Sequence, residues 1–197
     1  MTDTTPTLDP RTTALLVMDY QRGILDTLPD PRSPLSRTAD AIAGMRAYGA
    51  TVAYVRVGFT EDDWAAIPPT NEPFSFLGRQ RLMHHADAAT DIHPRLAPEP
   101  GDIVVRKTRI GALSTTDLDR RLRDRGVTTL VIAGISTSGV VLSTVTDAAD
   151  RDYRLHILSD CVADPDPQVH RALMTGVFPR VAHIIDVAEL RSLLRTE

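Results

Sequence analysis

Two charged residues of opposite sign each end an apolar segment of the chain. Asp19 ends TALLVMD, residues 13–19, and Lys107 ends DIVVRK, residues 102–107. A carboxylate at the end of a buried strand is partly desolvated, so it needs a partner or its pKa rises. Together the two residues could form a carboxylate–ammonium pair that holds an acid–base group in a defined state. Separately, Asp19 could be a helix cap or structural aspartate, and Lys107 a solvated lysine.

A hydroxyl-rich turn, GISTSGVVLST at residues 134–144, is the third candidate feature. It follows an apolar segment and leads into a helical one, so its backbone N–H groups and the helix dipole favour an oxyanion or carboxylate. Ser136, Thr137 and Gly139 are the candidate binding residues. The alternative is a Ser/Thr N-cap without further function. Because neither GxGxxG nor GxxxxGK[ST] is present, dinucleotide-binding and P-loop functions are disfavoured.

The elements that must position these residues follow from hydrophobic patterning. Several apolar segments are continuous rather than alternating, which is typical of strands buried on both faces of a parallel sheet. Segments with helical spacing lie between them, so the sequence predicts a doubly wound α/β domain with helices on both faces. The predicted strands are residues 13–19, 51–57, 102–107, 128–134, 154–160 and, more weakly, 182–186.

Three of the connecting segments have clear helical patterns. Residues 36–50 place apolar side chains on one face, and Gly49 suits a C-terminal cap. In residues 114–127, Ser114 and Asp117 have the spacing of a capping box. In residues 165–179, an apolar row is formed by Val169, Leu173 and Val177.

The segment 58–100 breaks the alternation, because six prolines punctuate it. A connection of this length in a compact domain is usually a lid, a binding segment or a small subdomain. We therefore expect residues 58–100 to form a long lid or substrate-binding segment within a single domain, 1–197. Arg79 and Arg81, in GRQRL, are candidates for binding a substrate carboxylate.

Composition excludes several classes of function. The net charge of −4 does not favour a nucleic acid or an anionic membrane as partner. No apolar run approaches the roughly 20 residues of a transmembrane helix, and the polar N-terminus does not resemble a secretory signal. The single cysteine, Cys161, fits a cytoplasmic location. CxxC and HExxH motifs are absent from the sequence, so we expect no metal, and no cofactor is indicated.

The chain resembles the isochorismatase-like, or cysteine hydrolase, superfamily over nearly its whole length. The resemblance rests on four ordered blocks: ALLVMDYQRGIL (14–25), GDIVVRKTRIGAL (101–113), LVIAGISTSGVVLSTVTDAADRDYRLHILSDCVAD (130–164) and VHRALMTGVFPRVAHI (169–184). It implies a six-stranded parallel sheet of order 3-2-1-4-5-6, in which Asp19 faces the turn. Lys107, two strands away at roughly 10 Å, would need its long side chain to reach Asp19. The resemblance also implies a small-molecule substrate and a homodimer or homotetramer.

The resemblance assigns roles to individual residues. Family amidases use an aspartate, a lysine and a cysteine, and the matching positions are Asp19, Lys107 and Val140. Valine has no nucleophilic atom, so thioester chemistry at that position is excluded. The family also has a cis peptide at the bond matching Ile135–Ser136. Some nicotinamidases of the superfamily bind a metal after the second strand, but residues 57–64 contain no histidine, so no metal is expected there.

Three hypotheses follow. The first is a hydrolase of C–N amide or enol-ether bonds that acts without a cysteine nucleophile, with Asp19 as general acid/base and Lys107 as its partner. Isochorismatases proper give the precedent, because their aspartate protonates a vinyl ether and water adds to the resulting cation. The second is a non-catalytic homologue that binds a ligand or partner. The third is an amidase that uses Cys161, although a free cysteine is most often a small buried hydrophobe.

Overall fold

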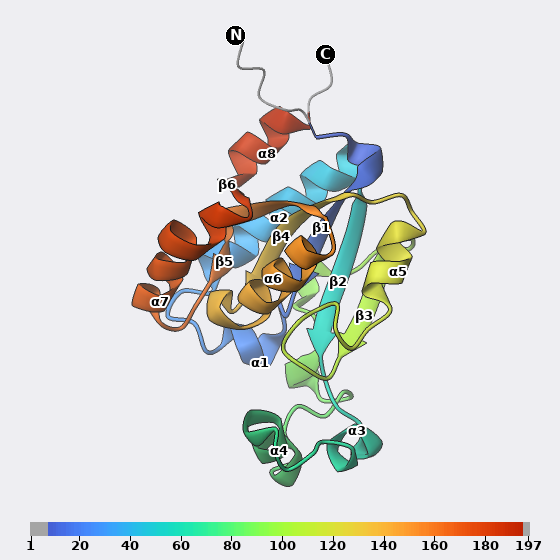
Figure 1. Cartoon of the computed structure of the whole chain (residues 1–197), viewed down its shortest axis with the longest axis vertical. Helices are drawn as coiled ribbons and strands as arrows, with labels where there is room; N and C mark the ends of the chain where they lie inside the picture. Colours follow the sequence, from blue (N-terminus) through green and yellow to red (C-terminus); the bar gives the residue numbers. More distant parts are fainter. Residues whose placement is uncertain (1–7, 195–197) are drawn as a thin grey trace.

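The structure, a computed structural model, describes residues 8–194. Its centre is a six-stranded, all-parallel sheet of order β3-β2-β1-β4-β5-β6, as the sequence and the resemblance predicted (Figure 1). Each predicted strand is present within three residues of its expected ends. The strands are β1 Thr13–Met18, β2 Thr51–Val57, β3 Ile103–Lys107, β4 Thr129–Ile135, β5 Arg154–Ala163 and β6 His183–Ile185.

The sheet is buried on both faces, which explains its continuous apolar strands. All six residues of β1 are buried. Alternate side chains of a strand point to opposite faces, so Leu16 and Met18 join one core cluster while Leu15 and Val17 join the other. A sequence read only for alternation would therefore have missed this strand.

Helices cover each face of the sheet. The helices α2 (Arg32–Ala47) and α8 (Val187–Leu193) bury apolar side chains in the cluster that holds Leu15, whereas α5 (Leu118–Arg123) and α6 (Leu142–Asp150) do so on the Leu16 side. The short α1 (Arg22–Leu25) follows β1, and α7 (Pro167–Ala172) follows β5. Between residues 8 and 194, no helix has the length and apolar character needed to cross a membrane.

The segment 58–100 forms a small lobe beyond the carboxyl ends of the strands. It contains α3 (Glu61–Ala65) and α4 (Glu72–Arg79), which lie below the sheet in Figure 1, and short 3-10 turns at Ala88–Thr90 and Pro94–Leu96. The lobe has a core cluster of its own. That cluster consists of Phe59, Trp64, Ile67 and Phe74 of the lobe together with Val57 at the end of β2.

One local expectation was wrong. The Ser114–Asp117 capping box does not form: α5 begins at Leu118, and the Thr116 hydroxyl instead accepts the Leu118 N–H at 3.1 Å. The apolar row of the 165–179 segment is partly exposed, because Val169 and Val177 are 39% and 41% exposed. The α-helix stops at Ala172 and continues as a wider π-helical turn, Leu173–Val177, which shifts the side chains relative to a regular helix.

Candidate active site

The carboxylate of Asp19 is placed by an unusual backbone conformation just after β1. Asp19 has a φ of 58°, in the left-handed region that few non-glycine residues adopt and that aspartate tolerates better than most. Its N–H still donates to the Val55 carbonyl of β2 at 2.8 Å. The chain therefore turns abruptly at the end of the strand. Backbone conformations of this kind concentrate at functional sites.

The neighbouring Gln21 fixes the end of β1 against its surroundings. Its buried amide nitrogen donates to the carbonyls of Val57 and Thr90, both at 2.7 Å, and its amide oxygen accepts the Val57 N–H at 2.7 Å. Three hydrogen bonds from one side chain thus tie β1 to β2 and to the 58–100 lobe. We did not predict this role, because a single glutamine in the sequence carries no signal of it.

Asp19 and Lys107 form a buried ion pair. Lys107 ends β3, and its Nζ lies 2.8 Å from Oδ2 of Asp19, with the two side chains 3% and 6% exposed. The same ammonium group donates to the carbonyls of Ile110 at 2.7 Å and Arg109 at 3.2 Å. All three N–H bonds of the ammonium group therefore have an acceptor, and the long side chain spans the distance between strands as expected.

The other oxygen of Asp19 has no partner in the described part of the chain. Oδ1 is buried and accepts no hydrogen bond there. Burial raises the pKa of Asp19 to about 6, although the nearby Lys107 charge and its hydrogen bond act to lower it. Asp19 therefore changes protonation state close to neutral pH, as a general acid or base requires, and it has an oxygen atom free to use.

The turn after β4 is the opposite wall. The Ile135–Ser136 peptide is cis, as the resemblance implies, and a π-helical turn, Thr137–Val141, leads into α6. The Ser138 N–H donates to Oδ2 of Asp164 at 2.7 Å, and the buried Thr137 hydroxyl lies 2.9 Å from Nδ1 of His170 on α7. Contacts to Asp164, just after β5, and to α7 thus hold the turn in place.

A cavity of about 270 Å³ lies between Asp19 and this turn. Its charged lining residues are Asp19, Lys107 and Arg109, and most of the others are apolar. The 58–100 lobe contributes Phe74, Leu77 and Met83. The remaining lining residues are Ile24, Thr27, Val57, Ile110, Ile135, Ser136, Gly139, Val140 and Pro165. Such a cavity, apolar with a few charged groups, suits a small organic molecule.

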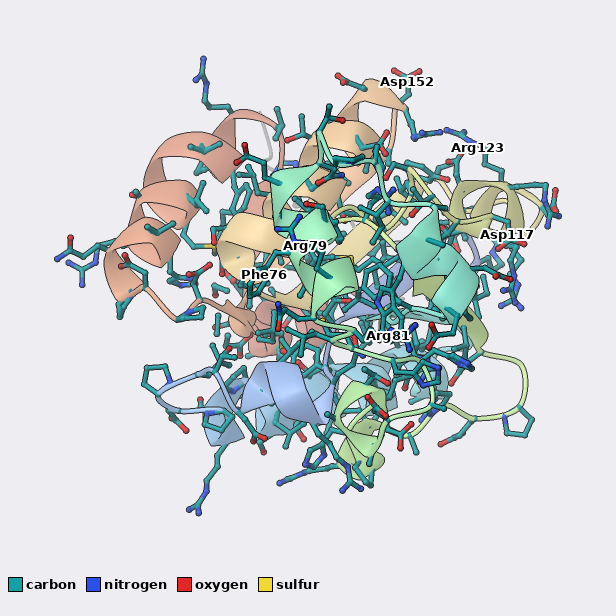
Figure 2. All side chains as sticks on the ribbon, turned by 90° about the horizontal axis from the view of Figure 1, so that it is seen from below. Phe76, Arg79, Arg81, Asp117, Arg123 and Asp152 are labelled. Atoms are coloured by element: carbon teal, nitrogen blue, oxygen red, sulfur yellow. The ribbon has the colours of Figure 1, made fainter. Side chains whose placement is uncertain are left out.

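Most of the predicted site residues meet at this cavity, but Thr137 and two arginines do not line it. The predicted residues that line the cavity are Asp19, Lys107, Ser136, Gly139 and Val140. The Thr137 side chain instead forms a hydrogen bond with His170. Arg79 and Arg81 line a separate cavity in the lobe beside Trp64, on the face seen in Figure 2. Arg81 also pairs with Glu61 at 2.8 Å, and Arg79 donates to Ser75 at 3.0 Å.

Cys161 does not line the Asp19 cavity. Its side chain is fully buried in the core cluster on the opposite sheet face from Val140. Burial raises the pKa of the Cys161 thiol well above its usual range. A thiol of this kind is a poor nucleophile, because the thiolate is the reactive form.

Arg109 lines the cavity although it was not among the candidate binding residues. It is half-buried in the cavity wall, its guanidinium lies 5.4 Å from the centre of the Phe74 ring, and it donates to the Thr108 carbonyl at 2.6 Å. No carboxylate among residues 8–194 forms an ion pair with it. Its position two residues after Lys107 was the available signal, because a residue that follows a strand end closely tends to share its site.

Within residues 8–194, no three His, Cys, Asp or Glu side chains gather where they could hold a metal ion.

Comparisons with known proteins identify the family. The model of the isochorismatase domain matches residues 13–189. The chain is 32% identical to YecD, an isochorismatase family protein of Escherichia coli O157:H7, over 95% of this chain and 98% of that one. It is also 32% identical to the ureidoacrylate amidohydrolase RutB of Methylobacterium radiotolerans, over 95% of this chain and 81% of the relative.

A solved structure agrees with these sequence matches. An isochorismatase family protein from Burkholderia thailandensis superposes with a TM-score of 0.82 and 29% identity, covering 97% of this chain and 99% of its own. The chain belongs to the isochorismatase family. It is therefore a member of a family of hydrolases.

Proposed function

We propose that the protein hydrolyses a C–N amide or enol-ether bond of a small molecule without a cysteine nucleophile. Asp19 is the general acid/base and Lys107 is its charge partner. The observation that carries the proposal is the buried Asp19–Lys107 pair at a cavity whose opposite wall, at Val140, has no nucleophilic atom. Nucleophilic attack therefore falls to water, and the proton chemistry falls to Asp19.

In this proposal Asp19 acts in both protonation states. For an enol ether, the neutral form, populated below pH 6, protonates the alkene carbon through Oδ1. Water adds to the resulting cation and returns a proton to the carboxylate, and the hemiketal or hemiacetal so formed breaks its C–O bond to release the alcohol and leave a carbonyl product. For an amide, ionised Asp19 takes a proton from the attacking water and then gives it to the nitrogen as the C–N bond breaks. Lys107 holds the ionised form in place through Oδ2. Backbone N–H groups of Ser136 and Thr137 bind the carbonyl or carboxylate oxygen of the substrate, whereas the Gly139 N–H donates to the Ser136 carbonyl at 3.2 Å.

Arg109 replaces Arg79 and Arg81 as the proposed anchor of a substrate carboxylate. The support is its place in the cavity wall and the absence of an ion-pair partner for it in residues 8–194. A relative is named for ureidoacrylate, which is a carboxylate. Substrate amides with and without a carboxylate test this role: Arg109→Gln should raise KM only for the carboxylates, because only they lose a charge-assisted pair.

The 58–100 lobe is the proposed substrate-binding lid. Phe74, Leu77 and Met83 of the lobe line one side of the cavity, so a substrate bound there contacts them. In this proposal the lobe selects the substrate and residues at the strand ends carry out the acid–base step.

The decisive experiment compares two aspartates with the same backbone conformation. Asp19→Asn removes the proposed acid/base, and asparagine tolerates a φ of 58°. Asp152 has a φ of 65° and lies at the edge of the molecule (Figure 2), so Asp152→Asn is the matched control. In a screen of small amides and enol ethers, we expect hydrolysis by the wild type and Asp152→Asn and none by Asp19→Asn. Equal rates for all three would refute the mechanism.

A non-catalytic, ligand-binding homologue is the second candidate, and the valine at the cavity wall favours it. A ligand that occupies the cavity without turnover would establish this candidate. The third candidate, an amidase that uses Cys161, has less support, because Cys161 lies in the core cluster on the sheet face opposite Val140. Iodoacetamide labelling of Cys161 that leaves activity unchanged would exclude it.

Assembly as a homodimer or homotetramer is part of the proposal. Light scattering of the purified protein tests it directly: a mass near the 21.6 kDa of one chain would contradict it.

A further inference from the structure

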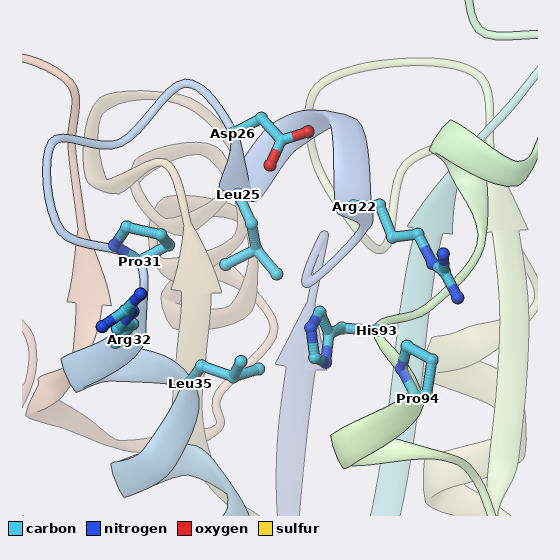
Figure 3. A pocket seen from close by; sticks show the side chains of 8 residues that line it. All are labelled: Arg22, Leu25, Asp26, Pro31, Arg32, Leu35, His93 and Pro94. Carbon is cyan, nitrogen blue, oxygen red and sulfur yellow. The ribbon is translucent and has the colours of Figure 1, made fainter.

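A second cavity, of about 500 Å³, lies on the other side of α1 from Asp19. We call it the α1–α2 groove. It runs between α1, the start of α2 and the turn at His93–Pro94 (Figure 3), and it shares no lining residue with the Asp19 cavity. Its lining residues are Arg22, Leu25, Asp26, Pro31, Arg32, Leu35, His93 and Pro94.

Two unpaired guanidinium groups flank the groove. Arg22 and Arg32 stand on its opposite sides in Figure 3, and in the described part of the chain neither side chain forms an ion pair or hydrogen bond. Other arginines, such as Arg46 and Arg106, are paired with carboxylates. Asp26 is the single carboxylate of the lining. The groove therefore presents more donors to an anion than its own carboxylate can satisfy.

His93 adds a third donor between the two arginines. Its ring points into the groove (Figure 3), and its Nδ1 accepts the Arg95 N–H at 3.2 Å. An accepting Nδ1 places the proton of the neutral ring on Nε2, which makes Nε2 a donor. Burial and the nearby Arg22 and Arg95 charges lower the pKa of His93, against a weaker opposite effect of Asp26, so this neutral form prevails at pH 7.

The rest of the lining is apolar. Leu25 and Leu35 are buried side chains, 3% and 8% exposed, and Pro31 and Pro94 complete the walls. We propose that the α1–α2 groove binds a small organic carboxylate, with its carboxylate beside Arg22 and His93, its apolar body against Leu25 and Leu35, and Arg32 as a second positive charge on the other side of the groove. The volume of the groove lies in the range of small-molecule sites.

The groove and the Asp19 cavity share α1 as a common wall. Leu25 and Asp26 line the groove, whereas Ile24 and Thr27 line the Asp19 cavity. The backbone N–H of His93 also donates to the backbone carbonyl of Tyr20 at 2.8 Å, and Tyr20 directly follows Asp19. A ligand in the groove therefore contacts the segment that follows the proposed acid/base.

Calorimetric titration with phenylacetate tests the proposal, with 2-phenylethanol as its uncharged counterpart. We expect phenylacetate to bind and 2-phenylethanol to bind at least about tenfold more weakly, because charge-assisted hydrogen bonds are lost. The double variant Arg22→Ala/Arg32→Ala should weaken phenylacetate binding by at least about tenfold. Both arginines are exposed, so the fold should persist, and circular dichroism checks this.

Two further variants locate the binding. Arg180→Ala removes an exposed arginine that does not line the groove, so it should leave the affinity for phenylacetate unchanged. Arg109→Ala removes the proposed carboxylate anchor of the Asp19 cavity, so any phenylacetate bound there should be lost while binding in the groove persists, which separates this proposal from the proposed hydrolase function. No binding, equal affinity of the double variant, or complete loss of binding in Arg109→Ala would each overturn the proposal.

Discussion

Asp19 and Lys107 are two buried charges that depend on each other at the scale of single residues. Removing one partner of such a pair leaves an uncompensated charge and typically costs about 3–5 kcal/mol. We therefore expect Lys107→Met to lower the free energy of unfolding by about this amount, measured by urea denaturation at pH 8. The carbonyls of Arg109 and Ile110 also lose their donor in this variant.

The double variant Asp19→Asn/Lys107→Met isolates the charge effect. Because asparagine carries no charge, the double variant should be more stable than Lys107→Met alone. Arg120→Met is the surface control: Arg120 pairs with Asp117 and Asp124, but its side chain is 66% exposed, so about 0–1 kcal/mol should be lost. A double variant less stable than Lys107→Met would show that the pair's geometry matters more than its charge.

Val140 offers a second residue-scale prediction. Its side chain lines the cavity that holds Asp19 and Lys107, so a thiol introduced by Val140→Cys would sit beside an ammonium group, which favours the thiolate. We expect iodoacetamide to label this variant at pH 7 much faster than the wild type, whose Cys161 is buried. Val140→Ala controls for the change in cavity size. Labelling no faster than in the wild type would mean that the position is closed to small molecules.

At the scale of elements, close packing joins β4 to the turn that follows it. A Cβ added at Gly134 would lie 3.0 Å from Cγ2 of Val141 and 3.3 Å from Cβ of Met18. Valine is stiff at χ1 and cannot easily withdraw. Gly134→Ala should therefore cost about 1–3 kcal/mol of stability, measured by urea denaturation.

Gly44 is the matched control for that substitution. It lies inside α2, and an added Cβ would meet only Cγ of Arg191, at 3.8 Å. Gly44→Ala should therefore stabilise the protein by about 0.5–1 kcal/mol, as alanine does in helix interiors. If both variants were equally stable, the close approach of β4 and the turn would have no energetic significance.

Elements were easier to predict from the sequence than contacts between them. The strands and their order followed from continuous apolar runs and the resemblance, because burial on both faces leaves a strong pattern. Cavity partners depend on loop conformation, which the pattern does not encode. Arg79 and Arg81 therefore line a different cavity from Asp19, Arg109 lines the Asp19 cavity although it was not a candidate, and the π-helical turn at Leu173 was not foreseen.

At the scale of the whole molecule, two buried groups give stability opposite dependences on pH. The pKa of Asp19 is raised to about 6, so its contribution is present below pH 3.8 and is lost as pH rises through 6. Burial lowers the pKa of His156 to about 4, with His183 and Arg154 acting in the same direction. Its contribution is present above pH 6.5 and is lost as pH falls through 4. As the pH rises from 4 to 6, the loss of stability from Asp19 and the gain of stability from His156 offset each other.

The difference between wild type and His156→Leu separates the His156 contribution. Both ring nitrogens of His156 are buried without a partner in residues 8–194, so leucine removes no hydrogen bond there. On lowering the pH from 7.5 to 4.5, the unfolding free energy of the variant should gain about 2–3 kcal/mol relative to the wild type. His183→Gln, which replaces the exposed histidine stacked 5.1 Å away, should show a much smaller relative gain. A difference independent of pH would mean that His156 is protonated as readily in the folded protein as in the unfolded chain.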